Sequence, residues 1–419
     1  MNEVKKYLDV DEEIIDLVLN TENELKDIYE QVDKMSMLNS MKVINAFWKE
    51  NVSEIHFNGT SGYGYSDVGR EVIEKIFALV LGGEASLVRN QFISGTHALT
   101  VALFALLRPK DKMLIISGEP YDTIQKVIGI KENQSSLKSY NIENEEIDLI
   151  ENDFDYKKII DSIKNNNYKV IYIQRSKGYS TRKSISIAKI EKVIKEIRTI
   201  NEDIIIMVDN CYCEFVEDKT PLEVGANLIV GSLIKNLGAG IASNGAYICG
   251  DSNLIELCAE RLNVPGQGIE VGPTQGVNKS FLQGLYSAPA VVSASIKTAI
   301  LTSRVMEKMG YNVEPKYNDS RVDIVQSIIF GNEKDLIKYT EGIQSGSAID
   351  SNVLPTPFIM PGYSNEIIMA SGSFIQGSSI EISCDAPIRE PFIAYQQGSL
   401  SYEYGKICLI KAIARLKKD

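Results

Sequence analysis

Residues 204–240 read IIIMVDNCYCEFVEDKTPLEVGANLIVGSLIKNLGAG, and this stretch decides the fold. It holds two apolar runs, at 204–209 and 228–232, and each run ends in a polar residue. Continuous β-branched runs of this length are typical of strands that are buried on both faces of a parallel sheet. The stretch therefore predicts two strands that end at Asp209 and Ser232, with Lys235 in the turn after the second strand.

The same pattern recurs toward the N-terminus. The runs MLIIS (113–117) and VIYIQ (170–174) also predict buried strands, and residues 190–200 form an amphipathic helical pattern between strands. Strands that alternate with helices predict a doubly wound α/β domain with a mostly parallel sheet.

The two ends of the chain differ from this central part. Residues 1 to about 50 are predicted to be helical, and a glycine- and tyrosine-rich loop follows at 57–70, before a helix from Glu71. Residues 289–310 predict one long helix, 323–331 a strand, and 367–383 a hairpin. We therefore predict an N-terminal arm and loop (1–70), a large α/β domain (71–288) and a smaller α+β domain (289–419).

Composition excludes several classes of function. The net charge of −12 disfavours nucleic acid and anionic membranes as partners. No apolar run approaches the roughly 20 residues of a membrane span, and the charged N-terminus lacks a signal-peptide centre, so we expect a cytoplasmic protein. With only His56 and His97, a multi-histidine metal site is excluded, and no metal is expected. The six scattered cysteines do not indicate a disulfide framework.

Four motifs carry candidate chemistry. Lys235 stands alone in a glycine-rich turn, where partial desolvation would make its amine a nucleophile toward an aldehyde, although most loop lysines are solvated surface charges. Asp209 at a strand end can face a ligand crevice or simply cap a turn. SGTHA (94–98) begins an apolar helix whose free N–H groups suit a phosphate, or forms an ordinary helix cap. EPYDT (119–123) places Tyr121 at the same sheet edge, where tyrosines usually serve packing.

The order and spacing of these motifs resemble fold-type I pyridoxal-phosphate (PLP) enzymes, and in particular the cystathionine and methionine gamma-lyase group. The sequence is most similar to the branch known as the aluminium-resistance or methionine gamma-lyase-like family. The resemblance extends over about residues 57–405. It rests on SGTHA, EPYDT, IQRSKGY, VDNCYCEF, GSLIKNLGAGIA, PGQGIEVG, QGLYSAP, MPGY and IEISCDAPIREPF.

The resemblance implies a role for each matching residue. Lys235 would hold PLP as a Schiff base, Asp209 would pair with the pyridine nitrogen, and Tyr121 would stack on the ring. The phosphate would be bound by Gly95, Thr96 and Ser232 and, from a neighbouring subunit, by Tyr65 and Arg70, with Tyr63 as the alternative tyrosine. The functional unit would then be a homodimer at least, and a homotetramer by analogy with the group.

This sequence departs from the group at two places. Ile234 replaces the hydroxyl residue that precedes the lysine, so one phosphate contact is missing. Glu381 occupies the place of the arginine that binds the substrate carboxylate. Arg389 is the nearest replacement, because an arginine suits bidentate carboxylate recognition, and Arg175 is a further pocket candidate that could equally form a salt bridge.

The resemblance implies a carbon–sulfur lyase that acts on a sulfur-containing amino acid by β- or γ-elimination. The substrate would displace Lys235, the freed amine would remove the α-proton, and the protonated ring would delocalise the resulting charge. Fold type I hosts many reactions, so aldol cleavage and racemisation stay open. A PLP-binding protein with a regulatory or metal-tolerance role is another alternative, which the intact Lys235, Asp209 and Tyr121 disfavour.

Overall fold

The computed structural model describes residues 6–360, 363 and 365–418. They fall into two compact units, one of residues 40–286 and the other of residues 1–39 and 287–419. This division differs from the predicted boundaries at 70 and 288, because the first helices belong to the same unit as the C-terminal residues. Pro361 and Gly362, in the MPGY motif, and residues 1–5 lie outside the described part.

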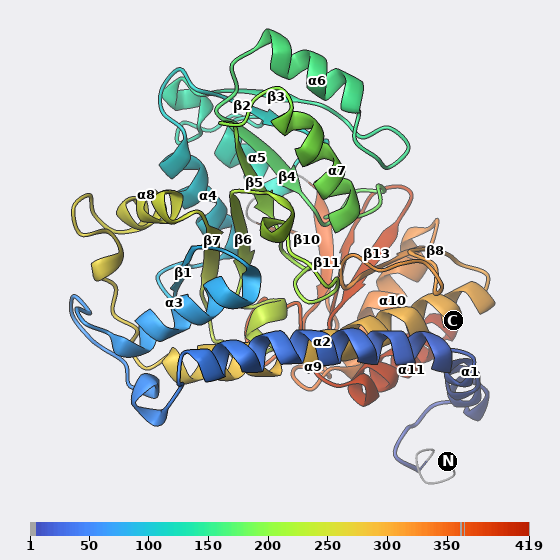
Figure 1. Cartoon of the computed structure of the whole chain (residues 1–419). Coiled ribbons are helices and arrows are strands. Elements are labelled where there is room, and N and C mark those ends of the chain that lie inside the picture. The colour runs from blue at the N-terminus through green and yellow to red at the C-terminus, as the bar shows by residue number, and fades with distance from the viewer. Residues whose placement is uncertain (1–5, 361–362, 364, 419) are drawn as a thin grey trace. The chain divides into compact units, whose positions relative to one another are not determined.

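The larger unit contains a seven-stranded sheet with the strand order β1-β7-β6-β5-β4-β2-β3. The neighbours from β6 to β3 run parallel, and only β7 is antiparallel to its partners β1 and β6. This confirms the predicted α/β class with a mostly parallel sheet (Figure 1). The strands are β1 (Ala85–Arg89), β2 (Lys112–Ile115), β3 (Glu143–Glu146), β4 (Val170–Gln174), β5 (Ile205–Asp209), β6 (Leu228–Ser232) and β7 (Ala246–Gly250).

Helices pack on both faces of this sheet. The helices of the unit are α3 (Val68–Leu81), α4 (Gly95–Leu106), α5 (Asp122–Ile128), α6 (Tyr156–Asn165), α7 (Ile187–Arg198) and α8 (Ser252–Leu262). Short 3-10 helices are η2 (Glu54–Phe57), η3 (Lys138–Tyr140), η4 (Leu222–Val224), η5 (Asn236–Gly238) and η6 (Gly268–Glu270). Helices α2 (Lys26–Lys49) and α9 (Asn278–Lys308) contribute residues to both units.

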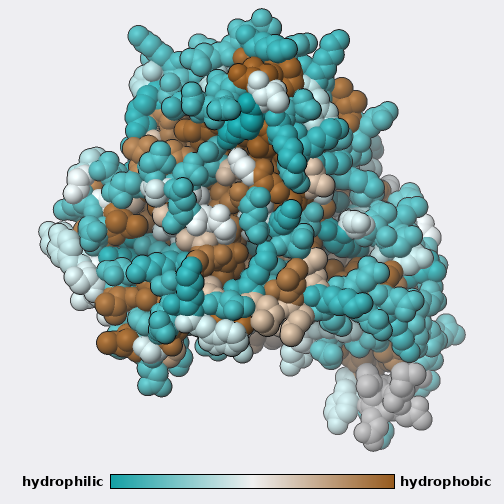
Figure 2. All heavy atoms as spheres, in the orientation of Figure 1, coloured by the Kyte–Doolittle hydropathy of each residue, from teal (hydrophilic) through white to brown (hydrophobic). Residues whose placement is uncertain are grey.

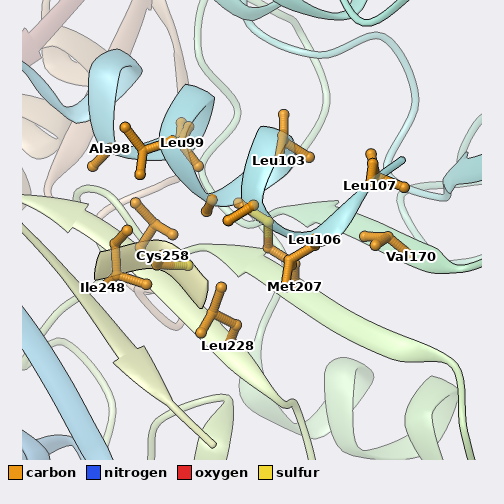
Figure 3. Close-up of a cluster of buried hydrophobic side chains, with 14 of the residues drawn as sticks. Ala98, Leu99, Leu103, Leu106, Leu107, Val170, Met207, Leu228, Ile248 and Cys258 are labelled. Atoms are coloured by element: carbon orange, nitrogen blue, oxygen red, sulfur yellow. The ribbon is translucent and has the colours of Figure 1, made fainter. Parts of the chain in front are cut away.

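The core of the larger unit lies between the sheet and the helices α4, α5 and α8 (Figure 3). Helix α4 is apolar nearly all round, as expected for a helix that is covered on every side. Its leucines contact side chains from four neighbouring strands and from α8. The labelled residues in this cluster are Ala98, Leu99, Leu103, Leu106, Leu107, Val170, Met207, Leu228, Ile248 and Cys258.

The opposite face of the sheet is covered in part by α3. On this face the ring of Phe77 lies 6.1 Å from that of Tyr247, centroid to centroid. Helix α3 begins at Val68, three residues earlier than predicted, because the Asp67 side chain accepts a hydrogen bond from the backbone N–H of Arg70 at 2.9 Å.

The smaller unit contains an antiparallel sheet with the strand order β10-β11-β12-β13-β9-β8. Its elements are α1 (Glu12–Asn23), β8 (Asn312–Glu314), β9 (Val325–Ile329), α10 (Glu333–Gly346), β10 (Phe358–Ile359), β11 (Glu366–Ala370), β12 (Ser383–Pro387), β13 (Ile393–Gln397) and α11 (Tyr402–Lys417). The predicted hairpin is the pair β11–β12. Its second strand begins later than expected because Glu381 is engaged with the preceding loop, where its carboxylate accepts from Phe374 N and Ile375 N.

Among the described helices, α9 has the length and apolar composition that a membrane span requires. It begins eleven residues before the predicted start at Pro289, and this proline lies inside it. About 67% of its most apolar window is buried within the protein, which is typical of a core helix.

Candidate functional site

Lys235 lies in the turn that follows β6, three residues beyond Ser232. Its side chain is half-buried, and Nζ lies 3.9 Å from the centroid of the Tyr212 ring. Burial lowers the pKa of Lys235, but nearby groups outweigh burial and raise it. These groups include the carboxyl groups of Asp209 and Glu214 and the Cys211 thiol, whose own pKa burial raises.

Asp209, one of these carboxylates, is the last residue of β5 and is 7% exposed. Its Oδ1 accepts a hydrogen bond from Cys211 N at 3.1 Å, and its Oδ2 accepts from the Tyr172 hydroxyl at 3.5 Å. The carboxylate is therefore fixed at the carboxyl end of a parallel strand, where an open α/β sheet binds its ligands.

The start of helix α4 meets the end of β6. A Cβ on Gly95 would lie 3.2 Å from Cβ of Ser232 and 3.5 Å from Sγ of Cys211. Ser94 caps the helix by accepting from His97 N at 3.0 Å, while the N–H groups of Gly95 and Thr96 have no intrahelical acceptor because they begin the helix. The Ser232 hydroxyl is buried, and no described residue forms a hydrogen bond with it. A buried free hydroxyl beside a helix N-terminus suits an anion.

Thr96 and Tyr121 border the same region. Thr96 Oγ1 lies 2.9 Å from Oγ1 of Thr123, in the first turn of α5. The backbone N–H of Tyr121 donates to Gln174 Oε1 at 2.7 Å, which ties the tyrosine to the end of β4. A Cβ on Gly178 would lie 3.0 Å from the Tyr121 ring, so this glycine leaves room for the aromatic side chain.

Tyr63 and Tyr65 are exposed at the tip of the loop before α3, with relative exposures of 68% and 57%. Their ring centroids are 5.6 Å apart. Gly64 adopts a positive φ of 71°, and a Cβ on it would lie 2.6 Å from the backbone of Pro273. The loop thus packs closely on residue 273 and presents both rings to solvent.

Arg70 does not extend outward with these tyrosines. It is 2% exposed, its Nη1 donates to the carbonyls of Gly64 (2.7 Å) and Gly272 (2.8 Å), and its Nη2 donates to that of Glu270 (3.1 Å). These contacts engage the guanidinium within its own chain. Arg70 therefore holds the tyrosine loop in place, and its contact with a partner's phosphate stays a prediction.

Arg175 is also buried, at 1% exposure. Its Nη1 donates to Asn210 Oδ1 at 2.6 Å, Nη2 pairs with Glu217 Oε2 at 2.5 Å, and Nε donates to Ile185 O at 3.3 Å. Arg175 thus forms an internal ion pair, which is one of the two alternatives that the sequence leaves open, and its role in a substrate pocket stays a prediction.

Arg389 lies in the smaller unit. It is exposed in the turn between β12 and β13, where its carbonyl accepts from Phe392 N at 2.8 Å. Glu381, which stands in place of the expected arginine, is 7% exposed and serves the loop contacts described above. The binding of a substrate carboxylate by Arg389 stays a prediction.

The structure adds residues that the sequence analysis did not single out. Tyr212 lies against Lys235 and adopts a positive φ of 71°, a conformation that costs energy for a tyrosine and is often found at functional sites. Tyr172 contacts Asp209, and Gln174 contacts Tyr121. The two residues are two positions apart in β4, so their side chains point to the same face of the sheet. The spacing of two in a strand could have predicted this shared face from the sequence. The positive φ of Tyr212 could not be predicted, because nothing in the sequence pattern indicates it.

The family comparison agrees with this geometry. A sequence model described as methionine gamma-lyase matches residues 14–417. The protein YnbB of Bacillus subtilis is 44% identical over 401 residues, which cover 95% of both chains. A 33.9 kDa protein of Lactobacillus delbrueckii is 39% identical over 71% of this chain and 98% of its own length.

Solved structures give the same relationship. A Clostridium novyi carbon–sulfur lyase involved in aluminium resistance superimposes with a TM-score of 0.94 at 44% identity, covering 99% of this chain and 98% of its own. A Clostridium acetobutylicum protein, provisionally named a cystathionine beta-lyase involved in aluminium resistance, gives 0.96 at 42% identity, with 100% and 99% coverage. Cystathionine gamma synthase of Xanthomonas oryzae, at 14% identity, covers 91% of this chain and 98% of its own with a TM-score of 0.61, and shares the fold.

Proposed function

Because the chain belongs to the methionine gamma-lyase family, we propose that it is a PLP-dependent carbon–sulfur lyase that acts on a sulfur-containing amino acid. Lys235 would carry the cofactor as a Schiff base. One observation carries the proposal: the buried hydroxyl of Ser232, which has no hydrogen-bond partner in the described part of the chain, lies beside Gly95 at the start of α4. Ser232 ends the strand that leads to Lys235. A phosphate and an aldehyde on one molecule would satisfy both groups.

The residues present fit PLP at its other parts as well. Asp209 offers a fixed carboxylate to the pyridine nitrogen, and Tyr121 offers an aromatic face near the end of β4. The missing hydroxyl at Ile234 leaves the phosphate to Ser232, Thr96 and the first-turn N–H groups of α4.

Each residue has a defined task in the proposed reaction. When bound, the cofactor supplies an electron-withdrawing ring that stabilises negative charge at the substrate α-carbon. The Lys235 amine would accept the α-proton and would then donate a proton to the thiolate that leaves as the carbon–sulfur bond breaks. Asp209 keeps the ring nitrogen protonated. Arg389 binds the substrate carboxylate through paired N–H donors.

We further propose that two copies of the chain complete one site. The loop of Tyr63 and Tyr65 exposes two aromatic rings on a backbone that is anchored internally by Arg70, and such rings suit the surroundings of a partner's cofactor phosphate. Figure 2 shows further hydrophobic groups at the surface of the larger unit. A hollow of about 560 Å³ in the same unit is lined by Trp48, Phe57 and Tyr286. A homotetramer of two such dimers, located in the cytoplasm, is the assembly we expect.

A panel of amino acids tests the reaction class. Purified protein with added PLP would be mixed with cystathionine, cysteine, methionine, serine, threonine and alanine, while pyruvate, 2-oxobutyrate and free thiol are measured. We expect oxoacid and thiol in equal amounts from at least one sulfur amino acid, and none with Lys235→Ala. Threonine cleavage to an aldehyde, or loss of chirality without oxoacid, would replace the lyase with aldol or racemase chemistry. Bound PLP with no turnover of any member would favour a regulatory or metal-tolerance role.

A further inference from the structure

A chain of buried polar residues crosses the larger unit behind the proposed cofactor site. It starts at Glu217, which pairs with Arg175, and Arg175 donates to Asn210. Asn210 Nδ2 donates to the Tyr247 hydroxyl at 3.4 Å, and this hydroxyl donates to Glu214 Oε1 at 2.9 Å. The chain therefore ends at the carboxyl group of Glu214.

This polar chain lies on the opposite face of the sheet from Ser232. In the β6–β7 ladder, Ser232 pairs with Ala246 and Gly231 pairs with Tyr247. Because successive side chains of a strand point to opposite faces, Tyr247 and Glu214 lie behind the sheet. A Cβ on Gly231 would lie 2.4 Å from Glu214 Oε1, so only a glycine at this position leaves room for the carboxyl group.

Glu214 contacts the chain on both sides of Lys235. Its carboxyl packs on Gly231, and its backbone carbonyl accepts from Asn236 Nδ2 at 3.0 Å. Glu214 is 2% exposed, and its Oε2 is buried without a hydrogen-bond partner among the described residues. An unpaired oxygen in such a place favours a neutral, protonated carboxyl unless a nearby positive charge compensates.

The groups that act on Glu214 come from three neighbouring elements. Burial raises the pKa of the Glu214 carboxyl to about 7, the Tyr247 hydrogen bond and the positive charge of Lys235 oppose burial, and the charge of Asp209 adds to it. The Cys211 thiol, also coupled to Glu214, is held neutral because burial raises its pKa. The neighbour of Tyr247 on α3 is Phe77, which carries no charge.

We propose that Glu214 is a positioning residue that sets the pH at which the nitrogen joining Lys235 to its cofactor loses its proton. The inference rests on the proposed function. Glu214 does not touch substrate; it acts through the charge that it gains or loses beside Lys235. An ionised Glu214 stabilises the protonated nitrogen, and a protonated Glu214 does not. The polar chain of Asn210 and Tyr247 holds the carboxyl in place for this effect.

The test is a pH titration of the yellow absorbance band of the resting holoenzyme, with no substrate present. Replacement of Glu214 by glutamine removes the charge and keeps the shape, so the Glu214→Gln band should titrate at a pH lower by about one unit. Tyr247→Phe removes the hydrogen bond that favours the ionised carboxyl, and should shift the titration in the same direction by less. Glu217→Gln, at the far end of the same polar chain, is the matched control and should leave the titration unchanged.

A second measurement uses the apoprotein. A carboxyl pKa that is raised from 4.5 to about 7 in the folded state contributes stability at low pH, and this stability is lost as pH rises from about 4.5 to about 7. The melting temperature of the parent should therefore fall relative to that of Glu214→Gln over this interval. Superimposable titrations of parent and Glu214→Gln holoenzymes, or an equal shift in Glu217→Gln, would overturn the inference. Absence of any yellow band that borohydride removes from the parent would instead overturn the proposed function.

Discussion

Gly95 lies so close to Ser232 that a Cβ on Gly95 would be 3.2 Å from Cβ of Ser232. This close approach joins the N-terminus of α4 to the end of β6, two segments that lie far apart in the sequence, and it is here that we propose the cofactor phosphate binds. At this junction the side-chain hydroxyl of Ser232 is buried, and it has no hydrogen-bond partner among the described residues.

Ser232→Ala should weaken PLP binding by about tenfold to a hundredfold, because a hydrogen bond to a charged phosphate contributes about 1.5–3 kcal/mol. The dissociation constant would be measured by adding PLP to apoprotein and following absorbance. Ser243→Ala, which changes an exposed serine of the same unit, is the control and should bind PLP like the parent. Equal affinities for the parent and Ser232→Ala would place the phosphate elsewhere.

Lys235→Arg should keep a positive charge beside Tyr212 but lose the covalent bond to PLP, since a guanidinium does not form a stable Schiff base under these conditions. Borohydride reduction followed by mass spectrometry should find PLP attached to Lys235 in the parent and to no lysine in the variant. Attachment to another lysine in the parent would contradict the assignment.

Asp209→Asn should lower kcat by about a hundredfold while folding and cofactor content stay close to those of the parent. The reason is that a neutral amide no longer keeps the ring nitrogen protonated. Steady-state kinetics on any substrate found in the panel would measure the effect. A kcat near that of the parent would show that Asp209 only fixes the turn through Cys211 N.

Tyr65→Ala and Lys235→Ala subunits should complement each other if the tyrosine loop serves the partner's site. Each variant alone should be nearly inactive, while hybrid dimers formed by subunit exchange should regain one intact site. Arg70→Lys is the contrast: it loses carbonyl contacts of its own chain, so it should lower the free energy of unfolding by about 1–3 kcal/mol. If subunits are shown to exchange but activity does not recover, Tyr65 does not serve the site of the partner subunit.

Arg389→Lys should raise KM for an amino-acid substrate by about tenfold and leave cofactor binding unchanged, because a single ammonium replaces a two-pronged carboxylate contact. The KM of an amine substrate that lacks the carboxylate should not change. Unaltered KM values for both compounds would place the carboxylate anchor at another residue.

Much of the fold could be predicted from the sequence because buried strands have a simple signature. The runs at 170–174 and 228–232 coincide with β4 and β6, where every residue is buried. Strand β3 has the sequence ENEE and was not predictable, since an edge strand needs no apolar side chains and takes its place by backbone pairing with β2. Helix α9 was predicted too short because Pro289 has the sequence signature of a helix start.

The residues of the candidate site could likewise be predicted only in part. Strand ends can be read from the sequence, so Asp209, Ser232 and Lys235 were identifiable. The partners of long side chains cannot be read in this way. The sequence suggests ligand-binding roles for Arg70 and Arg175. In the structure their guanidinium groups donate hydrogen bonds within the chain, to residues up to 202 positions away. Glu214 was missed because a glutamate in the turn after a strand resembles any surface glutamate.

The last two residues of β6 serve two unlike environments. Gly231 makes room for a buried carboxyl on one face, and Ser232 turns its hydroxyl to the other. A one-residue slip in this strand would exchange the two faces and damage both at once. In a library of variants selected for activity, insertions should therefore be tolerated in the surface loops. Insertions or deletions within residues 228–235 should be absent from the selected variants.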